Sequence, residues 1–256
     1  MNDYKWELYN VANDFSEAND LASKEPKKLR ELQDLFVAEA AKYNVLPLDN
    51  SKVERLDVSL RPNLTQGRSE FTYYPGMVRI PEGAAPDFKN KSFRIVADVD
   101  IPEGGAEGVL ITQGGRFNGF GLYLLQGKPV FHYNLVGVDR TSVASKDALG
   151  PGKHVVAVDF KYDGGGIGKG ALVTLSVDGK DVASARLART IPFRVSVDET
   201  LDVGEDTGTP VSEDYRVPFK FTGTLNRVVV DLSAASLSPK DQEELDRQEG
   251  ANEIID

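Results

Sequence analysis

One acidic loop holds the side chains of this sequence that are best suited to binding a metal ion. The run 204–211 contains Glu205, Asp206 and two threonine hydroxyls, and Asp202 lies just before it. Carboxylate and carbonyl oxygens gathered in a short loop are the ligands that Ca²⁺ prefers. We therefore predict that Asp202, Glu205 and Asp206 hold Ca²⁺, the one cofactor that the sequence suggests. A solvated acidic loop without an ion is the alternative.

The sequence offers few residues for catalysis. It has no cysteine, its two histidines are His132 and His154, and it contains no Gly-x-Ser-x-Gly motif. Asp98 and Asp100 share one face of a predicted strand. However, none of the predicted strands carries the Glu-x-Asp-x-x-Glu pattern of sandwich glycosidases, which need two carboxylates. We predict no catalytic residue, and we expect a chain that is not an enzyme.

Two further classes of ligand are disfavoured. The glycine-rich run 163–170 would need a helix directly after it to hold a phosphate, and a strand pattern follows instead. The chain has 30 Lys and Arg against 40 Asp and Glu, which gives a formal net charge of −10. This charge disfavours nucleic acids and anionic membranes as partners.

Four aromatic residues in turn-rich segments are candidates for contact with a sugar. They are Tyr73, Tyr74, Phe117 and Phe120. An exposed aromatic ring offers an apolar face that can stack on a sugar ring. We predict these four as ligand-binding residues and a glycan as a partner, with packing in the core or in hairpins as the alternative.

Alternating apolar residues predict the elements that position these side chains. Period-two patterns predict strands at 93–101, 121–125, 129–133, 154–160, 171–177, 193–197 and 224–232. Asp178-Gly179 and Gln126-Gly127-Lys128 predict tight hairpins between neighbouring strands. Many short strands with glycine-rich turns and no crossover helices predict an antiparallel β-sandwich or jelly roll, a mainly β fold.

The N-terminal segment follows a different pattern. Residues 5–9 predict a short strand, and a helix is expected from a cap at Ser23 to Asn44. Its apolar face, with that of the strand, consists of Trp6, Leu8, Leu29, Leu32 and Phe36. Because such a face must be covered, we predict that it docks on the sandwich or pairs with a second copy in a homo-oligomer.

These patterns divide the chain into four parts. We predict a strand–helix segment at 1–50, a connector at 51–80, the sandwich at 81–235 and an acidic helical tail at 236–256, capped by Ser238. The first residues lack the basic and apolar regions of a signal peptide, and no apolar run reaches the roughly 18 residues of a membrane helix. As written, the chain is expected to be soluble and cytoplasmic.

Several stretches resemble a known family. Residues 5–22 contain Trp-Glu-Leu-Tyr-Asn and then Asp-x-x-Glu-x-x-Asp-Leu-Ala. This run resembles the strand and turn near the end of the catalytic domain of arylsulfatases, and 27–49 resembles the helix that follows. The stretches that resemble the C-terminal extension of a bacterial arylsulfatase subgroup are 74–76, 108–110, 114–117, 203–215 and 219–224. The resemblance implies a concanavalin- or laminin-G-like sandwich after the end of a sulfatase domain.

The chain also departs from that family. Sulfatases make a formylglycine from a Cys/Ser-x-Pro-Ser-Arg motif, and this sequence has none. The resemblance therefore implies a non-catalytic accessory module, which supports domain packing, oligomerisation or substrate access. Its partner would be a sulfatase catalytic domain, and the parent enzyme would be periplasmic. The alternative is a carbohydrate-binding, lectin-like sandwich with Ca²⁺ in the acidic loop.

Overall fold

The chain forms two compact units in the computed structural model, Met1–Arg55 and Leu56–Asp256, and each is described here by itself. The structure describes residues 5–48, 64–65, 67–196, 198–233, 237–241, 243–244 and 247. Much of the predicted connector at 51–80 and most of the predicted tail at 236–256 therefore lie outside the described residues.

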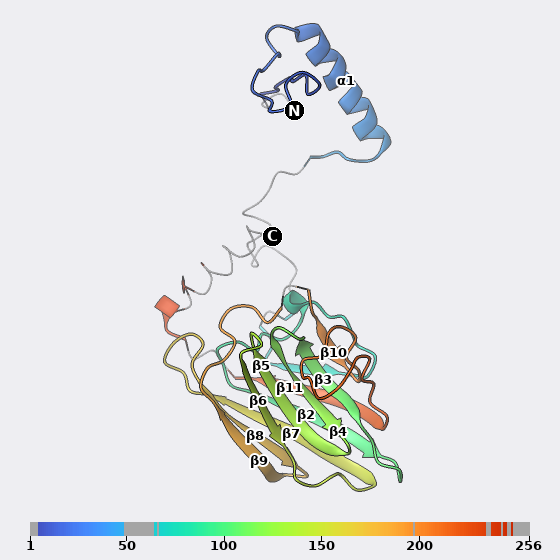
Figure 1. Ribbon diagram of the computed structural model, residues 1–256, viewed down its shortest axis with the longest axis vertical. Helices are drawn as coiled ribbons and strands as arrows, with labels where there is room; N and C mark the ends of the chain where they lie inside the picture. Colours follow the sequence, from blue (N-terminus) through green and yellow to red (C-terminus); the bar gives the residue numbers. More distant parts are fainter. Residues whose placement is uncertain are drawn as a thin grey trace. The chain divides into compact units, whose positions relative to one another are not determined.

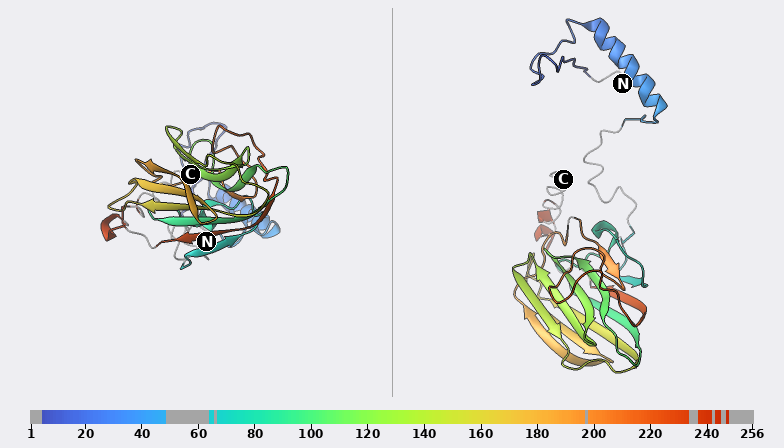
Figure 2. Two further views of the ribbon diagram at one scale, coloured as in Figure 1. Left: turned by 90° about the horizontal axis from the view of Figure 1, so that it is seen from below. Right: turned by 45° about the vertical axis from the view of Figure 1, so that its right-hand side comes forward.

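The second unit is a sandwich of two antiparallel sheets, which confirms the predicted fold class (Figures 1 and 2). One sheet has six strands in the order β1 (Glu70–Tyr73), β11 (Thr224–Leu232), β2 (Phe93–Ile101), β7 (Gly152–Tyr162), β8 (Ala171–Val177) and β9 (Lys180–Leu187). The other has five, in the order β10 (Leu201–Val203), β3 (Gly108–Gly114), β4 (Gly119–Leu125), β5 (Lys128–Leu135) and β6 (Asp139–Ala144). A short 3₁₀ helix, η2, spans Glu82–Ala84.

The main core lies between the two sheets. Along β2, every second side chain from Phe93 to Ile101 is buried, as the alternating pattern predicts. Phe93 stacks on Phe160 of β7 with ring centroids 4.4 Å apart, and Phe88 packs edge-on against both Phe93 and Phe120. Apolar burial of this extent is what drives a sandwich to close.

Both predicted hairpin turns are present. Asp178 and Gly179 have φ values of 51° and 77° and join β8 to β9, where Val177 pairs with Lys180. Gln126 and Gly127 have φ values of 51° and 78° and join β4 to β5. Two consecutive residues with positive φ form the turn whose twist matches that of paired strands.

The predicted strand at 193–197 does not form. Its described residues, 193–196, are irregular. Their backbone N–H groups bond to a side chain instead of a strand, since the Glu82 carboxylate accepts from Val195 at 3.1 Å and from Ser196 at 3.2 Å. Val197 lies outside the described residues.

A segment between β10 and β11 covers the outer face of the five-stranded sheet, and we call residues 204–223 the strap (Figure 1). Val211 and Tyr215 of the strap pack with Val109, Tyr123 and Val130 of β3, β4 and β5. These strand residues alternate with side chains of the main core, so they lie on the opposite face of the sheet. The strap therefore encloses a second, smaller core.

The first unit contains α1 (Pro26–Lys42) and the irregular segment before it. The predicted strand at 5–9 is wrong: Leu8 accepts one backbone bond from Leu21, and its N–H donates to the Asp20 carboxylate at 3.0 Å. The helix starts at Pro26 after Glu25, without a side-chain cap, so Ser23 does not cap it.

The predicted apolar face is partly assembled within this unit. Trp6 meets Phe36 edge-on with centroids 5.8 Å apart, whereas Leu32 is 39% exposed. Docking on the sandwich and self-association both stay predictions.

The described part of the tail agrees with its predicted start. The Ser238 hydroxyl accepts from the Asp241 N–H at 3.2 Å, and the Asp241 carboxylate accepts from the Ser238 N–H at 3.3 Å. This is the reciprocal bonding of a helix cap. No helix among the residues that the structure describes is long and apolar enough to span a membrane.

Candidate functional site

Asp202, the first predicted metal ligand, bonds within the protein. It is buried on β10, and its Oδ1 accepts from the Arg79 N–H at 2.6 Å. Its Oδ2 accepts from the backbone N–H of Thr207 at 2.7 Å and from the Thr207 hydroxyl at 2.6 Å. These bonds tie the start of the strap to the segment that follows β1.

Asp206, the second predicted ligand, is 1% exposed. Its Oδ2 accepts from the Tyr215 hydroxyl at 2.6 Å and its Oδ1 from the Gly208 N–H at 3.3 Å. Burial raises the pKa of Asp206 to about 6, and the nearby carboxylates of Asp202 and Glu199 act in the same direction. The described residues include no group of three or more His, Cys, Asp or Glu side chains suited to a metal ion. The calcium site stays a prediction without support from this geometry.

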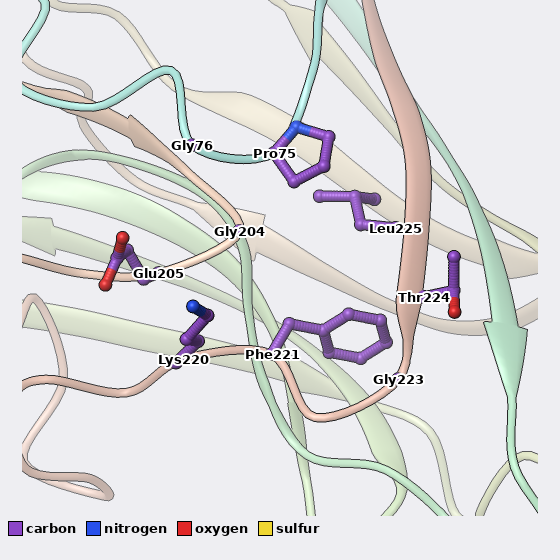
Figure 3. A pocket seen from close by; sticks show the side chains of 9 residues that line it. All are labelled: Pro75, Gly76, Gly204, Glu205, Lys220, Phe221, Gly223, Thr224 and Leu225. Carbon is purple, nitrogen blue, oxygen red and sulfur yellow. The ribbon is translucent and has the colours of Figure 1, made fainter.

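Glu205, the third predicted ligand, lines a pocket instead (Figure 3). The pocket has a volume of about 360 Å³ and lies where β10 leads into the strap and the strap leads into β11. Three separate stretches form its walls: Pro75–Gly76, Gly204–Glu205 and Lys220–Leu225 without Thr222. We call this space the strap pocket.

Backbone hydrogen bonds hold the three stretches together. The Gly76 N–H donates to the Val203 carbonyl at 3.1 Å, and the Phe221 N–H donates to the Gly204 carbonyl at 2.9 Å. Gly204 has a φ of +85°, and a Cβ there would come within 3.1 Å of the Pro75 Cβ. A glycine is therefore needed for the chain to turn this close to Pro75.

Glu205 and Lys220 are the charged residues of the strap pocket. Among the described residues, neither side chain has a hydrogen-bond or ion-pair partner. Their exposure differs, since Glu205 is half-buried and Lys220 is exposed. A free carboxylate and a free ammonium group can accept and donate hydrogen bonds to one polar ligand.

The rest of the wall is apolar. Pro75 lies above the pocket in Figure 3, and the Phe221 ring and Leu225 lie on the side away from Glu205. Phe221 is 7% exposed and Leu225 is 6% exposed, so they form a packed wall and not a mobile rim. An apolar wall facing a few fixed polar groups is the usual composition of a small-molecule site.

The predicted aromatic site is only partly exposed. Tyr73 and Phe120 are 6% and 1% exposed, so the prediction that they contact a ligand is wrong. Both belong to the main core: Tyr73 alternates with exposed neighbours along β1, and Phe120 lies between two glycines on β4. Tyr74 and Phe117 are 55% and 77% exposed. Tyr74 directly precedes Pro75, whereas Phe117 lies in the turn between β3 and β4 and does not line the strap pocket.

The two histidines occupy structural positions. His132 is 5% exposed on β5; its Nδ1 lies 2.8 Å from the Ser142 hydroxyl, and its Nε2 has no partner among the described residues. Burial lowers the pKa of His132. His154 lies 2.8 Å from the Asp178 carboxylate and 2.9 Å from the Gly150 carbonyl, and the bond to Asp178 raises its pKa.

Comparison with known proteins identifies no family. No family model matches the chain, and no curated protein matches it. The resemblance to arylsulfatases therefore gains no support and stays a prediction.

Several solved structures are similar to this chain at low sequence identity. The Ruminococcus gnavus IT-sialidase CBM40 bound to alpha2,3 sialyllactose is 20% identical over 72% of this chain and 94% of its own, with a TM-score of 0.46. Mouse laminin alpha1 chain, domains LG4-5, is 19% identical over 65% of this chain and 43% of its own, with a TM-score of 0.39. The Caenorhabditis elegans galectin LEC-6 is 13% identical over 66% of this chain and 98% of its own, with a TM-score of 0.35. We draw no functional argument from likenesses of this degree.

Proposed function

We propose that this chain is a non-catalytic, carbohydrate-binding β-sandwich and that the strap pocket holds the sugar. One observation carries the proposal: Glu205 and Lys220 are both without partners in the described structure and face an apolar cavity of about 360 Å³. Charged side chains that no protein group occupies are available to a ligand, and an apolar wall beside a few polar groups is usual in a small-molecule site.

A sugar ring fits this arrangement chemically. Its hydroxyls can donate to the Glu205 carboxylate and accept from the Lys220 ammonium, while its C–H face lies against Pro75 and the edge of Phe221. The two charges are opposite in sign, so the pocket has no net charge to attract a charged sugar. We therefore propose a neutral saccharide as the ligand.

The number of carboxylates in the pocket supports binding without catalysis. Glycoside hydrolysis needs two carboxyl groups on either side of the scissile bond. Among the described residues that line the strap pocket, Glu205 is the one carboxylate. The neighbouring Asp206 is bonded to Tyr215 within the strap and is buried.

The test is a screen of neutral glycans on an array, followed by calorimetric titration of the best binder. We expect Glu205→Ala and Lys220→Ala each to weaken binding at least tenfold. Lys161→Ala, which removes an exposed lysine on β7, should bind as wild type does. If no neutral glycan binds, or if both pocket variants bind as tightly as wild type, the proposal fails.

Two of the sequence-based predictions can be tested beside the glycan screen. Repeating the titration with a chelator tests whether Ca²⁺ contributes. A pull-down with a bacterial arylsulfatase catalytic domain tests the accessory-module prediction, which rests on sequence resemblance alone. Tight capture together with a blank glycan array would favour the accessory role over sugar binding.

A further inference from the structure

The edge strands β6 of one sheet and β9 of the other lie on the same side of the sandwich (Figure 1). A second cavity is lined by residues of both strands. Its volume is about 300 Å³. Three arginines line it: Arg140 on β6, Arg186 on β9 and Arg189 just after β9. We call this space the arginine cavity.

The arginine cavity gathers three guanidinium groups in a chain with a formal net charge of −10. Three guanidinium groups line it, and the one carboxylate among its described lining residues is Asp139. Two carboxylates outside the lining, Glu213 and Asp163, pair with Arg140 and Arg186, so three carboxylates balance the three arginines and the cavity offers guanidinium donors without a net positive charge.

The guanidinium groups retain hydrogen-bonding capacity. Arg140 pairs with Glu213 at 2.6 Å, Arg189 pairs with Asp139 at 2.6 Å, and Arg186 pairs with Asp163. Each guanidinium has five N–H donors in a fixed plane, and one carboxylate occupies only some of them. The three acidic side chains are 69%, 46% and 33% exposed in that order, so these pairs are open to water and individually weak.

One apolar side chain adds to the cavity. Val138 lines it and is 77% exposed. An exposed aliphatic group beside arginines offers contact for the C–H groups of a ligand that also carries an anionic group. A simple inorganic ion would not use this side chain.

We propose that the arginine cavity binds the anionic group of an acidic saccharide, a sulfate or a carboxylate. Planar arginine donors suit both oxyanions, because each can accept two parallel N–H bonds from one guanidinium. The choice of a saccharide rests on the proposed function, whereas the preference for an anion rests on the three arginines alone.

The test uses two defined probes at low ionic strength, a heparin-derived hexasaccharide and a hexagalacturonate. The first presents sulfates with carboxylates, and the second presents carboxylates only, so their relative affinities identify the anion. We expect at least one to bind wild type, with an affinity that falls as salt is added. Arg186→Gln combined with Arg189→Gln should weaken binding at least tenfold.

Two control variants separate the loss of arginine from general effects. Arg94→Gln removes an arginine paired with Asp159 on the six-stranded sheet, away from the cavity, and should bind within twofold of wild type. Arg189→Gln with Asp139→Asn leaves the net charge unchanged and should still weaken binding. Thermal unfolding of each variant shows that it is folded.

The outcomes distinguish this proposal from the proposed function. Glu205→Ala should leave binding of the acidic probes intact, and the double arginine variant should leave neutral-sugar binding intact. If neither acidic probe binds wild type, or if Arg94→Gln weakens binding as much as the double arginine variant, the proposal is overturned whatever the neutral glycans do.

Discussion

Gly121 of β4 lies directly beneath Val211 of the strap, and a Cβ at position 121 would come within 2.9 Å of the Val211 Cγ1. Gly121 stands between Thr112 of β3 and His132 of β5 in the register of the five-stranded sheet. The close approach means that the strap packs on the sheet at van der Waals distance, and His132, the neighbour of Gly121 on β5, is buried.

Gly121→Ala should therefore destabilise the sandwich. The added methyl group must displace the strap or the sheet, and overpacking of this kind costs about 1–3 kcal/mol. Gly104→Ala is the matched control, since a Cβ at that position would meet no atom within 4 Å. Urea unfolding of both variants checks the expectation. Equal stability of Gly121→Ala and wild type would show that the strap does not press on the sheet.

Asp206→Asn should change how stability depends on pH. The pKa of Asp206 is raised to about 6 from an ordinary value of 3.8, because burial disfavours its charged form. The folded state therefore binds this proton more tightly than the unfolded state. The resulting stability is fully present below pH 3.8 and is lost as the pH rises through 6.

The asparagine removes this dependence and can still accept the Tyr215 hydroxyl bond. The quantity to compare is the free energy of unfolding of the variant minus that of wild type. We expect this difference to be about 2 kcal/mol larger at pH 7.5 than at pH 4, as a shift of about two pKa units implies. Urea unfolding at both values measures this. Asp181→Asn, at an exposed site on β9, controls for the loss of one surface charge. A constant difference between variant and wild type would contradict the raised pKa.

His132→Gln should act in the opposite direction. Burial lowers the pKa of His132, chiefly by desolvation, while Arg140 lowers it further and Asp214 and Glu213 oppose the change. The unfolded state therefore takes up the proton first as the pH falls below 6.5, and wild type loses stability there. Glutamine cannot take up that proton.

The stability of wild type minus that of His132→Gln should therefore decrease between pH 7.5 and pH 5. Chemical denaturation across this range measures the difference. A profile in which both proteins lose stability in parallel would show that His132 is not the group responsible.

Local patterns in the sequence are sufficient to predict many strands and turns of the sandwich. The alternation in β2 and the positive-φ pairs at Gln126-Gly127 and Asp178-Gly179 depend on neighbouring residues, so they could be predicted. The failure at 193–197 has a distant cause, because the Glu82 carboxylate takes the N–H groups that a strand would have used. No local pattern contains that information.

The candidate site was harder to predict for the same reason. Tyr73 and Tyr74 are adjacent and similar, and only the pairing of β1 with β11 decides that Tyr73 faces the core. The sequence places Glu205 and Asp206 in one acidic loop. In the structure Glu205 lines the strap pocket, whereas the Asp206 side chain is buried. Pro75 and Lys220 stand far apart in sequence, and they meet through the backbone bonds of Val203 and Gly204.

Tyr215→Phe should destabilise the protein in a manner that depends on the charge of Asp206. The Tyr215 hydroxyl donates to the Asp206 Oδ2 at 2.6 Å within the strap, and both residues are buried. Removing that donor at pH 7.5 leaves a buried carboxylate without its strongest partner, which costs about 2–3 kcal/mol. At pH 4 the carboxyl is protonated and neutral, so the cost should fall to about 1 kcal/mol.

Tyr123→Phe supplies the matched comparison. Tyr123 packs against Tyr215 with ring centroids 5.1 Å apart, and its hydroxyl also donates to an aspartate, Asp214, at 3.1 Å. Asp214 is exposed, so water can replace the lost donor, and we expect a cost below about 1 kcal/mol at both pH values. If both variants lose the same stability at pH 7.5, burial of Asp206 does not increase the cost of removing its tyrosine donor.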